Sequence, residues 1–148
     1  MQPSRYFSQY ARRAMMQARQ YAYDSQHREL DTSHLLVGIL RAEGSLGEQV
    51  LTALHMQLDT TRHAVGLLHP KRLTDPTEPI PMTPALRATI TLAVEAARRL
   101  AQSYIGTEHL LLGLCQCQCG TATDILQANA IRFDDLARQV EARLAQGE

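Results

Sequence analysis

The octet TSHLLVGI at residues 32–39 returns 75 residues later as TEHLLLGL at residues 107–114. A shared register without a net gap indicates that one supersecondary unit is duplicated. Two copies are too few for a solenoid, so the sequence predicts one compact domain with pseudo-twofold symmetry. The same offset relates residues on both sides of the octet: Ala18 with Ala93, Ala22 with Ala97, Asp59 with Asp134, and Val65 with Val140.

Apolar residues in both copies recur with a helical period. The first stripe, behind Ser8 or Ser4 as the N-cap, contains Phe7, Ala11, Met15, Ala18 and Ala22. We expect three more helices in the first copy, at about 32–41 (capped by Thr32), 48–55 and 59–68. In the second copy the expected starts are Thr83-Pro84, Thr107, Thr123 and Asp134. No segment alternates over strand length, so the sequence predicts an all-α fold of about eight helices, four per copy.

A proline-rich segment separates the two copies. Four prolines between residues 70 and 81 are too many for a helix or a strand ladder to continue. The sequence therefore predicts repeat one at about 5–69, a linker at 70–82 and repeat two at about 83–145. Each copy alone would leave its leucine-rich face half exposed. Because burying one leucine contributes roughly 1.5–3 kcal/mol, we expect separated halves to be unstable.

The charge balance argues against nucleic acids and membranes as partners. The chain has 15 basic and 15 acidic residues and a formal net charge of zero, so no positive excess attracts phosphates or lipid head groups. No apolar run reaches the roughly 20 residues of a membrane span, and the start lacks the apolar core of a signal peptide. We therefore expect a cytoplasmic protein.

Three cysteines form one cluster, Cys115-Gln116-Cys117-Gln118-Cys119. So tight a cluster cannot make a disulfide framework, and an unpaired thiol in it suits a reducing cytoplasm. Soft-metal binding through adjacent thiolates is an alternative, but a structural zinc site would need a second, distant pair of ligands. If the helix persists, Cys115 and Cys119 share a face and Cys117 points away.

Two histidines, His34 and His109, occupy equivalent places in the first turns of their helices. We expect both to be buried and to tie adjacent segments together through a ring nitrogen. A metal pair is the alternative, but glycines stand four residues later, where a second ligand would be needed. The remaining histidines have the pattern of solvated surface: His27, His55, His63 and His69.

Glu108 marks a difference between the copies, because its counterpart is Ser33. The helix dipole favours a carboxylate in the first turn by about 0.3–1 kcal/mol, which is a structural explanation. The functional alternative is that Glu108 binds a ligand's guanidinium or ammonium group while nearby free amides bind an anion. No phosphate-binding loop, nucleophile elbow or zinc-protease motif occurs. We therefore expect no enzyme, no catalytic residue, no metal site and no cofactor.

The second copy resembles a known family. The segment SYIGTEHLLLGL at 103–114, with IPMTP at 80–84, is similar to the double Clp-N motif. That motif is the amino-terminal domain of the Clp AAA+ unfoldases, and the similarity is greatest to the ClpC branch. It covers about residues 5–145. The resemblance implies an all-α pseudo-twofold domain that recognises substrate proteins and adaptor proteins for an ATP-driven unfoldase and its partner protease.

In the ClpC branch the resemblance also implies two pockets, one per copy, for phosphoarginine on marked proteins. The glutamate would contact the guanidinium, and the hydroxyl residue that caps the copy's first helix would lie close to the phosphate. Carried onto this sequence, the second-copy pocket would comprise Thr83, Arg87, Thr107 and Glu108. The degenerate first-copy pocket would comprise Ser8, Thr32 and Ser33.

The first-copy pocket departs from the family pattern. It reads Asp31-Thr32-Ser33 where the family has Gly-Thr-Glu. Ser33 supplies no charge, although Asp31 or Glu29 could partly replace it. We therefore expect this pocket to be weakened or lost, leaving about one phosphoarginine site per chain. In the second copy, Cys117-Gln118-Cys119 replaces an acidic Glu-Gly-Glu, which puts an adaptor contact by this loop in doubt.

The chain ends at Glu148 without an ATPase module. Two interpretations follow: a fragment of a full unfoldase, or a free-standing Clp-N module that binds substrates or adaptors and assists or competes with the unfoldase. The divergent first copy and the cysteines favour the free-standing form. A third interpretation is a metal- or thiol-responsive regulator built on this fold.

Overall fold

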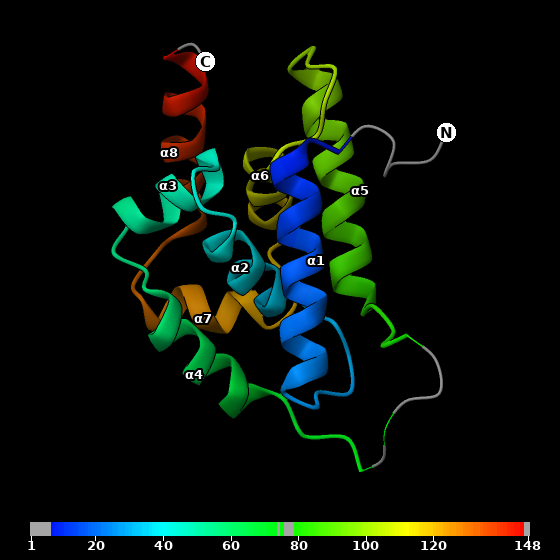
Figure 1. Ribbon diagram of the computed structural model, residues 1–148. Coiled ribbons are helices and arrows are strands. Elements are labelled where there is room, and N and C mark those ends of the chain that lie inside the picture. Colours follow the sequence, from blue (N-terminus) through cyan, green and yellow to red (C-terminus); the bar gives the residue numbers. More distant parts are fainter. Residues whose placement is uncertain (1–6, 74, 76–78, 147–148) are drawn as a thin grey trace.

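The computed structural model describes residues 7–73, 75 and 79–146. Within these ranges the chain forms eight α-helices and no β-sheet, which confirms the predicted all-α fold. Ser4, the start of repeat one and residues 74 and 76–78 of the predicted linker lie outside the described residues. The helices (Figure 1) are α1 (Gln9–Asp24), α2 (Thr32–Arg41), α3 (Leu46–Ala53), α4 (Leu58–Leu68), α5 (Pro84–Arg99), α6 (Thr107–Cys117), α7 (Ala122–Ala128) and α8 (Phe133–Ala145).

The helices repeat with the offset of the sequence. α1 and α5 are both 16 residues long and occupy equivalent positions in the two copies. Ser8 and Thr83 are their N-caps, as predicted. Each hydroxyl accepts a hydrogen bond from the amide three residues later, at 3.0 Å in α1 and 3.1 Å in α5.

The third and fourth helices of each copy begin one or two residues before their expected starts. α3 follows Ser45, whose hydroxyl accepts a hydrogen bond from the amide of Glu48 (3.1 Å). α4, α7 and α8 begin at Leu58, Ala122 and Phe133. In each case the expected start was a polar residue of the first turn, whereas an apolar residue takes the first helical position.

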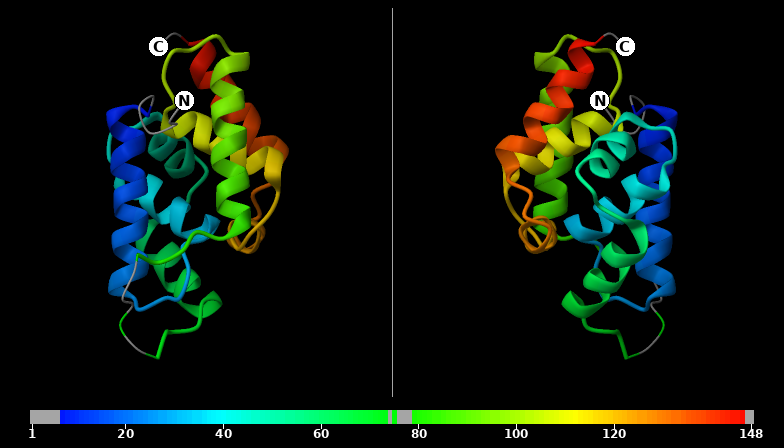
Figure 2. Two further views of the ribbon diagram at one scale, coloured as in Figure 1. Left: turned by 90° about the vertical axis from the view of Figure 1, so that its right-hand side faces the viewer. Right: turned by 90° about the vertical axis from the view of Figure 1, so that its left-hand side faces the viewer.

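The closest helix pairs are α1 with α2 and α5 with α6 (Figure 2). Each pair has a glycine at its contact, because a Cβ on Gly38 would overlap the carbonyl of Ala14 and one on Gly113 would overlap that of Thr89. The duplicated octets thus lie at the centre of the domain. Their fully buried large side chains are Leu35, Leu36, Ile39, Leu110, Leu111 and Leu114.

The segments before α2 and α6 join the two repeats. The amide of Ser8, at the start of α1, donates to the carbonyl of Ile105 (2.9 Å), and the amide of Thr83, at the start of α5, donates to that of Leu30 (3.0 Å). The start of α1 therefore lies beside the start of α6, and the start of α5 beside the start of α2. Figure 1 shows these two junctions at opposite ends of the long helices α1 and α5.

Candidate functional site

The predicted caps Thr32 and Thr107 act on neighbouring helices rather than on their own. Thr32 Oγ1 accepts a hydrogen bond from the amide of Ala122 at the start of α7 (2.9 Å), and Thr107 Oγ1 accepts one from the amide of Gly47 in α3 (2.8 Å). Both threonines are already the first residues of their helices, and the residues before them take the N-cap positions. The prediction that they cap their own helices is therefore wrong, since their hydroxyls reach across the repeat boundary.

His34 and His109 tie each helix start to the loop before it. Each Nδ1 accepts a hydrogen bond from the amide three residues earlier, at 2.9 Å and 2.8 Å. A neutral ring whose Nδ1 accepts carries its proton on Nε2. That nitrogen faces His27 Nδ1 in the first repeat (2.8 Å) and Gln102 Oε1 in the second. The predicted structural role of both histidines is confirmed.

Glu108 folds back over the start of its own helix. Its carboxylate lies so close to Gly106 that a Cβ there would be 2.7 Å from the Glu108 carboxyl carbon. The Tyr104 hydroxyl donates to Glu108 Oε2 (2.9 Å), and Glu108 is only 6% exposed. The first turn of a helix leaves amides without intrahelical partners, and the starts of α6 and α1 meet here. We call Ser8, Tyr104, Gly106, Thr107 and Glu108 the Glu108 corner.

The structure divides the residues of the predicted second-copy pocket. Ser8, which the copy-by-copy assignment places in the other pocket, bonds through its amide to Ile105, three residues before Glu108. Thr83 lies at the opposite junction, where its hydroxyl donates to Asp31 Oδ1 (2.7 Å). Arg87 follows Thr83, exposed in the first turn of α5. Each hydroxyl cap, Ser8 or Thr83, thus lies in the pocket of the other copy. The reason is that each copy's first helix begins beside the other copy's second helix.

The equivalent place in the first repeat holds a closed network of hydrogen bonds. Asp31 accepts from the hydroxyl of Thr83 (2.7 Å) and from both the amide (3.0 Å) and the hydroxyl (2.7 Å) of Thr121. Ser33 Oγ lies 2.7 Å from Thr121 Oγ1 and 2.9 Å from His69 Nε2. We call these five residues the Asp31 cluster. Ser33 is fully buried, so its hydroxyl serves the protein's own network.

Asp31 supplies the negative charge that Ser33 lacks. Burial raises the pKa of the Asp31 carboxyl, but hydrogen bonds from Thr121, Thr83 and the backbone outweigh burial and leave the pKa below its ordinary value. The carboxylate is therefore ionised at neutral pH. Both of its oxygen atoms already accept hydrogen bonds from Thr83 or Thr121, so the protein's own donors occupy the position that a ligand would take.

His69 of the Asp31 cluster also contacts two other histidines, His27 and His34, which contact each other. The ring centroids are 5.1 Å apart for His27 and His34, 5.3 Å for His27 and His69, and 4.5 Å for His34 and His69. His27 is 2% exposed and His69 is half-buried, so the prediction that these two are solvated is wrong. His55 and His63 are exposed, as predicted. His27 and His69 are covered because they follow the ends of α1 and α4, where the chain turns toward the interior.

Mild acid is expected to destabilise the domain through these rings. Burial is the main cause that lowers the pKa of His27 to about 4, and the charges of His69, Lys71 and Arg72 add to it. Burial and the neighbouring histidines lower the pKa of His34 to about 3. An unfolded histidine titrates near 6.5, so below that pH the unfolded chain binds more protons and stability falls as pH falls. Urea unfolding should show a loss of about 2 kcal/mol between pH 6.5 and 5.5.

His27→Gln is the matched control, because Gln102 stands at the equivalent position of the second repeat. This variant should lose about half of the pH dependence, since one of the two strongly shifted rings is gone. A wild-type unfolding free energy that stayed constant over the same pH interval would contradict the buried, neutral state of these histidines.

The cysteines adopt a different arrangement from the expected one. Cys117 and Cys119 are paired as a disulfide, and Cys115 is a buried free thiol whose pKa burial raises to about 12. α6 ends at Cys117 and Gln118 has a left-handed backbone (φ 51°). One of the three thiols is therefore unpaired. Because α6 does not continue past Cys117, the condition under which Cys115 and Cys119 would share a helix face is not met.

Among residues 7–73, 75 and 79–146, no three His, Cys, Asp or Glu side chains are grouped as a metal ion would require. None of the helices in this part of the chain combines the length and the apolar character needed to cross a bilayer.

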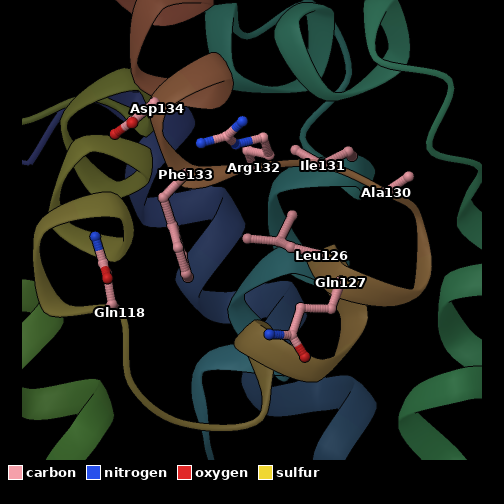
Figure 3. Close-up of a pocket in the computed structure, with 8 residues that line it drawn as sticks. All are labelled: Gln118, Leu126, Gln127, Ala130, Ile131, Arg132, Phe133 and Asp134. Carbon is pink, nitrogen blue, oxygen red and sulfur yellow. The ribbon is translucent and has the colours of Figure 1, made fainter.

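A pocket of about 540 Å³ lies between the end of α6, α7 and the start of α8. Leu126 and Ile131 are buried parts of its lining, Phe133 is half-buried, and Gln118 and Arg132 add polar groups. Figure 3 shows Leu126 of α7 and Phe133 of α8 extending toward each other, with Gln118 at the end of α6 on the far side of Phe133. Such a lining suits an apolar side chain of a peptide. No local sequence pattern indicates this pocket, because its residues come together only in the fold.

Comparison with known proteins supports one family for the whole domain. Residues 6–147 match the family model described as the Clp repeat (R) N-terminal domain. An uncharacterised protein of Mycobacterium tuberculosis is 36% identical over 116 residues, which are 78% of this chain and 45% of that protein. The negative regulator of genetic competence ClpC/MecB of Bacillus subtilis is 29% identical over 142 residues, 96% of this chain and 17% of that protein. The chain thus spans less than half the length of these relatives.

A solved structure shares the fold. The N-terminal domain of the caseinolytic-protease-associated chaperone ClpD from Arabidopsis thaliana has a TM-score of 0.78 at 22% identity, covering 98% of this chain and 97% of that one. The resemblance expected from residues 103–114 and 80–84 is therefore confirmed over nearly the full length. The chain belongs to the Clp repeat N-terminal domain family.

Proposed function

We propose that this chain is a non-catalytic recognition domain that binds substrate or adaptor proteins for a Clp-type unfoldase and its protease. Its family membership over residues 6–147 and its likeness to the N-terminal domain of ClpD support this role. The net charge of zero fits protein partners better than nucleic acids or membranes. Residues 1–148 would then serve to capture a protein that a separate ATPase module unfolds.

The ligand that best suits the Glu108 corner is a phosphorylated arginine side chain. Its guanidinium would pair with the Glu108 carboxylate, and such a charge-assisted hydrogen bond contributes roughly 1.5–3 kcal/mol. Its phosphate would bind the Ser8 hydroxyl and first-turn amides, where helix dipoles favour an anion. The observation that carries this proposal is the Glu108 carboxylate folded over the start of α6, beside the start of α1.

We do not expect the Asp31 cluster to bind phosphoarginine. Ser33 carries no charge and is buried, and the Asp31 carboxylate already accepts three hydrogen bonds. A ligand would have to displace these internal donors, each of which would then need another partner. We therefore propose about one phosphoarginine site per chain.

Replacing Glu108 with glutamine should weaken binding of a phosphoarginine peptide by tenfold or more. The amide keeps the size of the side chain and an acceptor for Tyr104, but removes the charge that pairs with the guanidinium. A loss of 1.4 kcal/mol corresponds to a tenfold change in affinity. Isothermal titration calorimetry would give both the affinity and the stoichiometry, which should be near one for the wild type.

Ser33→Ala is the matched control at the equivalent position and should leave affinity unchanged. Peptides with unmodified arginine and with phosphoserine would show whether both charges of the ligand are needed. Undiminished binding by Glu108→Gln would reject Glu108 as the guanidinium partner. Two equivalents bound per wild-type chain would show that the Asp31 cluster is open to ligand.

A further inference from the structure

We propose that Cys117 and Cys119 form a reversible thiol–disulfide site whose oxidation state controls the loop between α6 and α7. Their sulfur atoms are paired across one intervening residue, with Cα atoms 5.2 Å apart, a separation common in disulfides. Both residues are only half-buried, so a small thiol can reach them, whereas Cys115 is buried. This inference goes beyond protein recognition and does not depend on the Glu108 corner.

The pairing depends on where α6 ends. In a continuous helix, residues two positions apart point to nearly opposite sides, which would hold the two sulfur atoms apart. Gln118 has left-handed angles (φ 51°, ψ 46°), a region uncommon for side chains other than those of Asn and Asp. This turn brings Cys117 and Cys119 together. The bond in return holds Gln118 in its turn.

The loop held by this bond carries contacts to the first repeat. The carbonyl of Cys119 accepts a hydrogen bond from the hydroxyl of Thr32 (3.2 Å). The amides of Thr121 and Ala122 also donate to first-repeat side chains, at 3.0 Å and 2.9 Å. Gln118 lines the 540 Å³ pocket (Figure 3). The oxidation state of the cysteine pair therefore acts on both the Asp31 cluster and one wall of the pocket.

The chemical step is thiol–disulfide exchange with a dithiol. One thiolate of the dithiol attacks one sulfur of the pair and forms a mixed disulfide. The bond between the cysteines breaks, and the other sulfur leaves as a thiolate that takes up a proton. The second thiolate of the dithiol then attacks the mixed disulfide, which releases the second cysteine and leaves the reagent as a cyclic disulfide. Two electrons pass to the protein, and a small-molecule disulfide reverses the reaction.

Alkylation and hydrogen exchange on the whole wild-type chain test this site. After equilibration with oxidised glutathione and denaturation, intact mass should show one alkylated cysteine, against three after dithiothreitol. Reduction should speed exchange of the Thr121 and Ala122 amides about tenfold and lower the melting temperature by roughly 2–4 °C. The double variant Cys117→Ser/Cys119→Ser should show fast exchange with or without reductant, whereas Cys115→Ala should keep the full response.

Three outcomes would overturn the proposal. Three alkylated cysteines after oxidation would show that the bond does not form, and a mass increase for bound glutathione would identify a mixed disulfide instead. A bond that forms, but whose reduction leaves exchange at residues 119–124 unchanged, would show that it does not control the loop. All three results come from the wild-type chain, so a variant that fails to fold does not prevent the test.

Discussion

Replacing Gly38 with alanine is expected to lower the free energy of unfolding by about 3 kcal/mol. The added methyl group would overlap the backbone carbonyl of Ala14 and lie 3.0 Å from the Cβ of Ala18. Neither atom can rotate away, because both are fixed to the α1 backbone. α1 and α2 would have to separate, which loosens the most closely packed pair of the first repeat. Urea unfolding followed by circular dichroism would measure the loss.

Two other glycines provide matched comparisons. Gly113→Ala places a methyl against the carbonyl of Thr89, so it should destabilise the second repeat by a similar amount. A methyl at Gly66, in α4, would meet none of the described atoms within 4 Å. Gly66→Ala should therefore stabilise the chain by about 0.5–1 kcal/mol through helix propensity. Equal effects of the changes at Gly38 and Gly66 would contradict the close packing of α1 on α2.

Replacing Asp31 with alanine is also expected to cost about 3 kcal/mol of stability. The change removes the acceptor of three hydrogen bonds, one from Thr83 and two from Thr121. Each donor left without a partner costs about 1–3 kcal/mol where water cannot replace the lost contact. Asp31→Asn keeps the shape and one acceptor oxygen, so it should lose less. Urea unfolding of both variants at pH 7 would give the two values.

Asp59→Ala is the control for loss of a carboxylate. The Asp59 side chain is 95% exposed and its ion pair with Arg62 is 3.8 Å long, so at most about 1 kcal/mol should be lost. Because the pKa of Asp31 lies below its ordinary value, its contribution is present above the unfolded pKa and is lost as pH falls. The difference between wild type and Asp31→Asn should therefore shrink in acid. If Asp31→Ala were as stable as Asp59→Ala, the cluster would contribute nothing to stability.

The helices could be predicted from sequence because their signals are local. Apolar stripes recur every three or four residues, and the caps Ser8 and Thr83 stand directly before the helices that they serve. The internal offset added a second, independent copy of each signal. The structural role of His34 and His109 followed from the same repetition. The repeat limits at 5–69 and 83–145 stay predictions.

The junctions between repeats could not be predicted, since they depend on how the copies dock. Thr32 has the sequence context of an ordinary cap, and nothing nearby shows that its hydroxyl serves α7. The grouping of Thr83 with Asp31, rather than with Glu108, likewise appears only when the two copies are brought together. The burial of His27 could not be predicted either, because the contacting rings of His34 and His69 come from other segments.

The end of α6 at Cys117 could not be predicted from sequence, for a different reason. The nearest stop signal is Gly120, which has a positive φ of 77°, yet the chain already leaves the helix at Gln118. The stop is therefore set by the contacts that the following loop makes with Thr32 and Asp31. Tertiary structure overrides local propensity at this point.

Thr32 and Thr107 each complete a helix of the opposite copy. A protein with a single copy per chain could build such corners only as a symmetric homodimer, in which any substitution would appear in both corners at once. Fusing two copies in one polypeptide removes that constraint. The two corners can then diverge: Ser33 and Asp31 bond to the protein's own side chains in one, whereas the other carries Glu108, which under the proposed function binds a ligand.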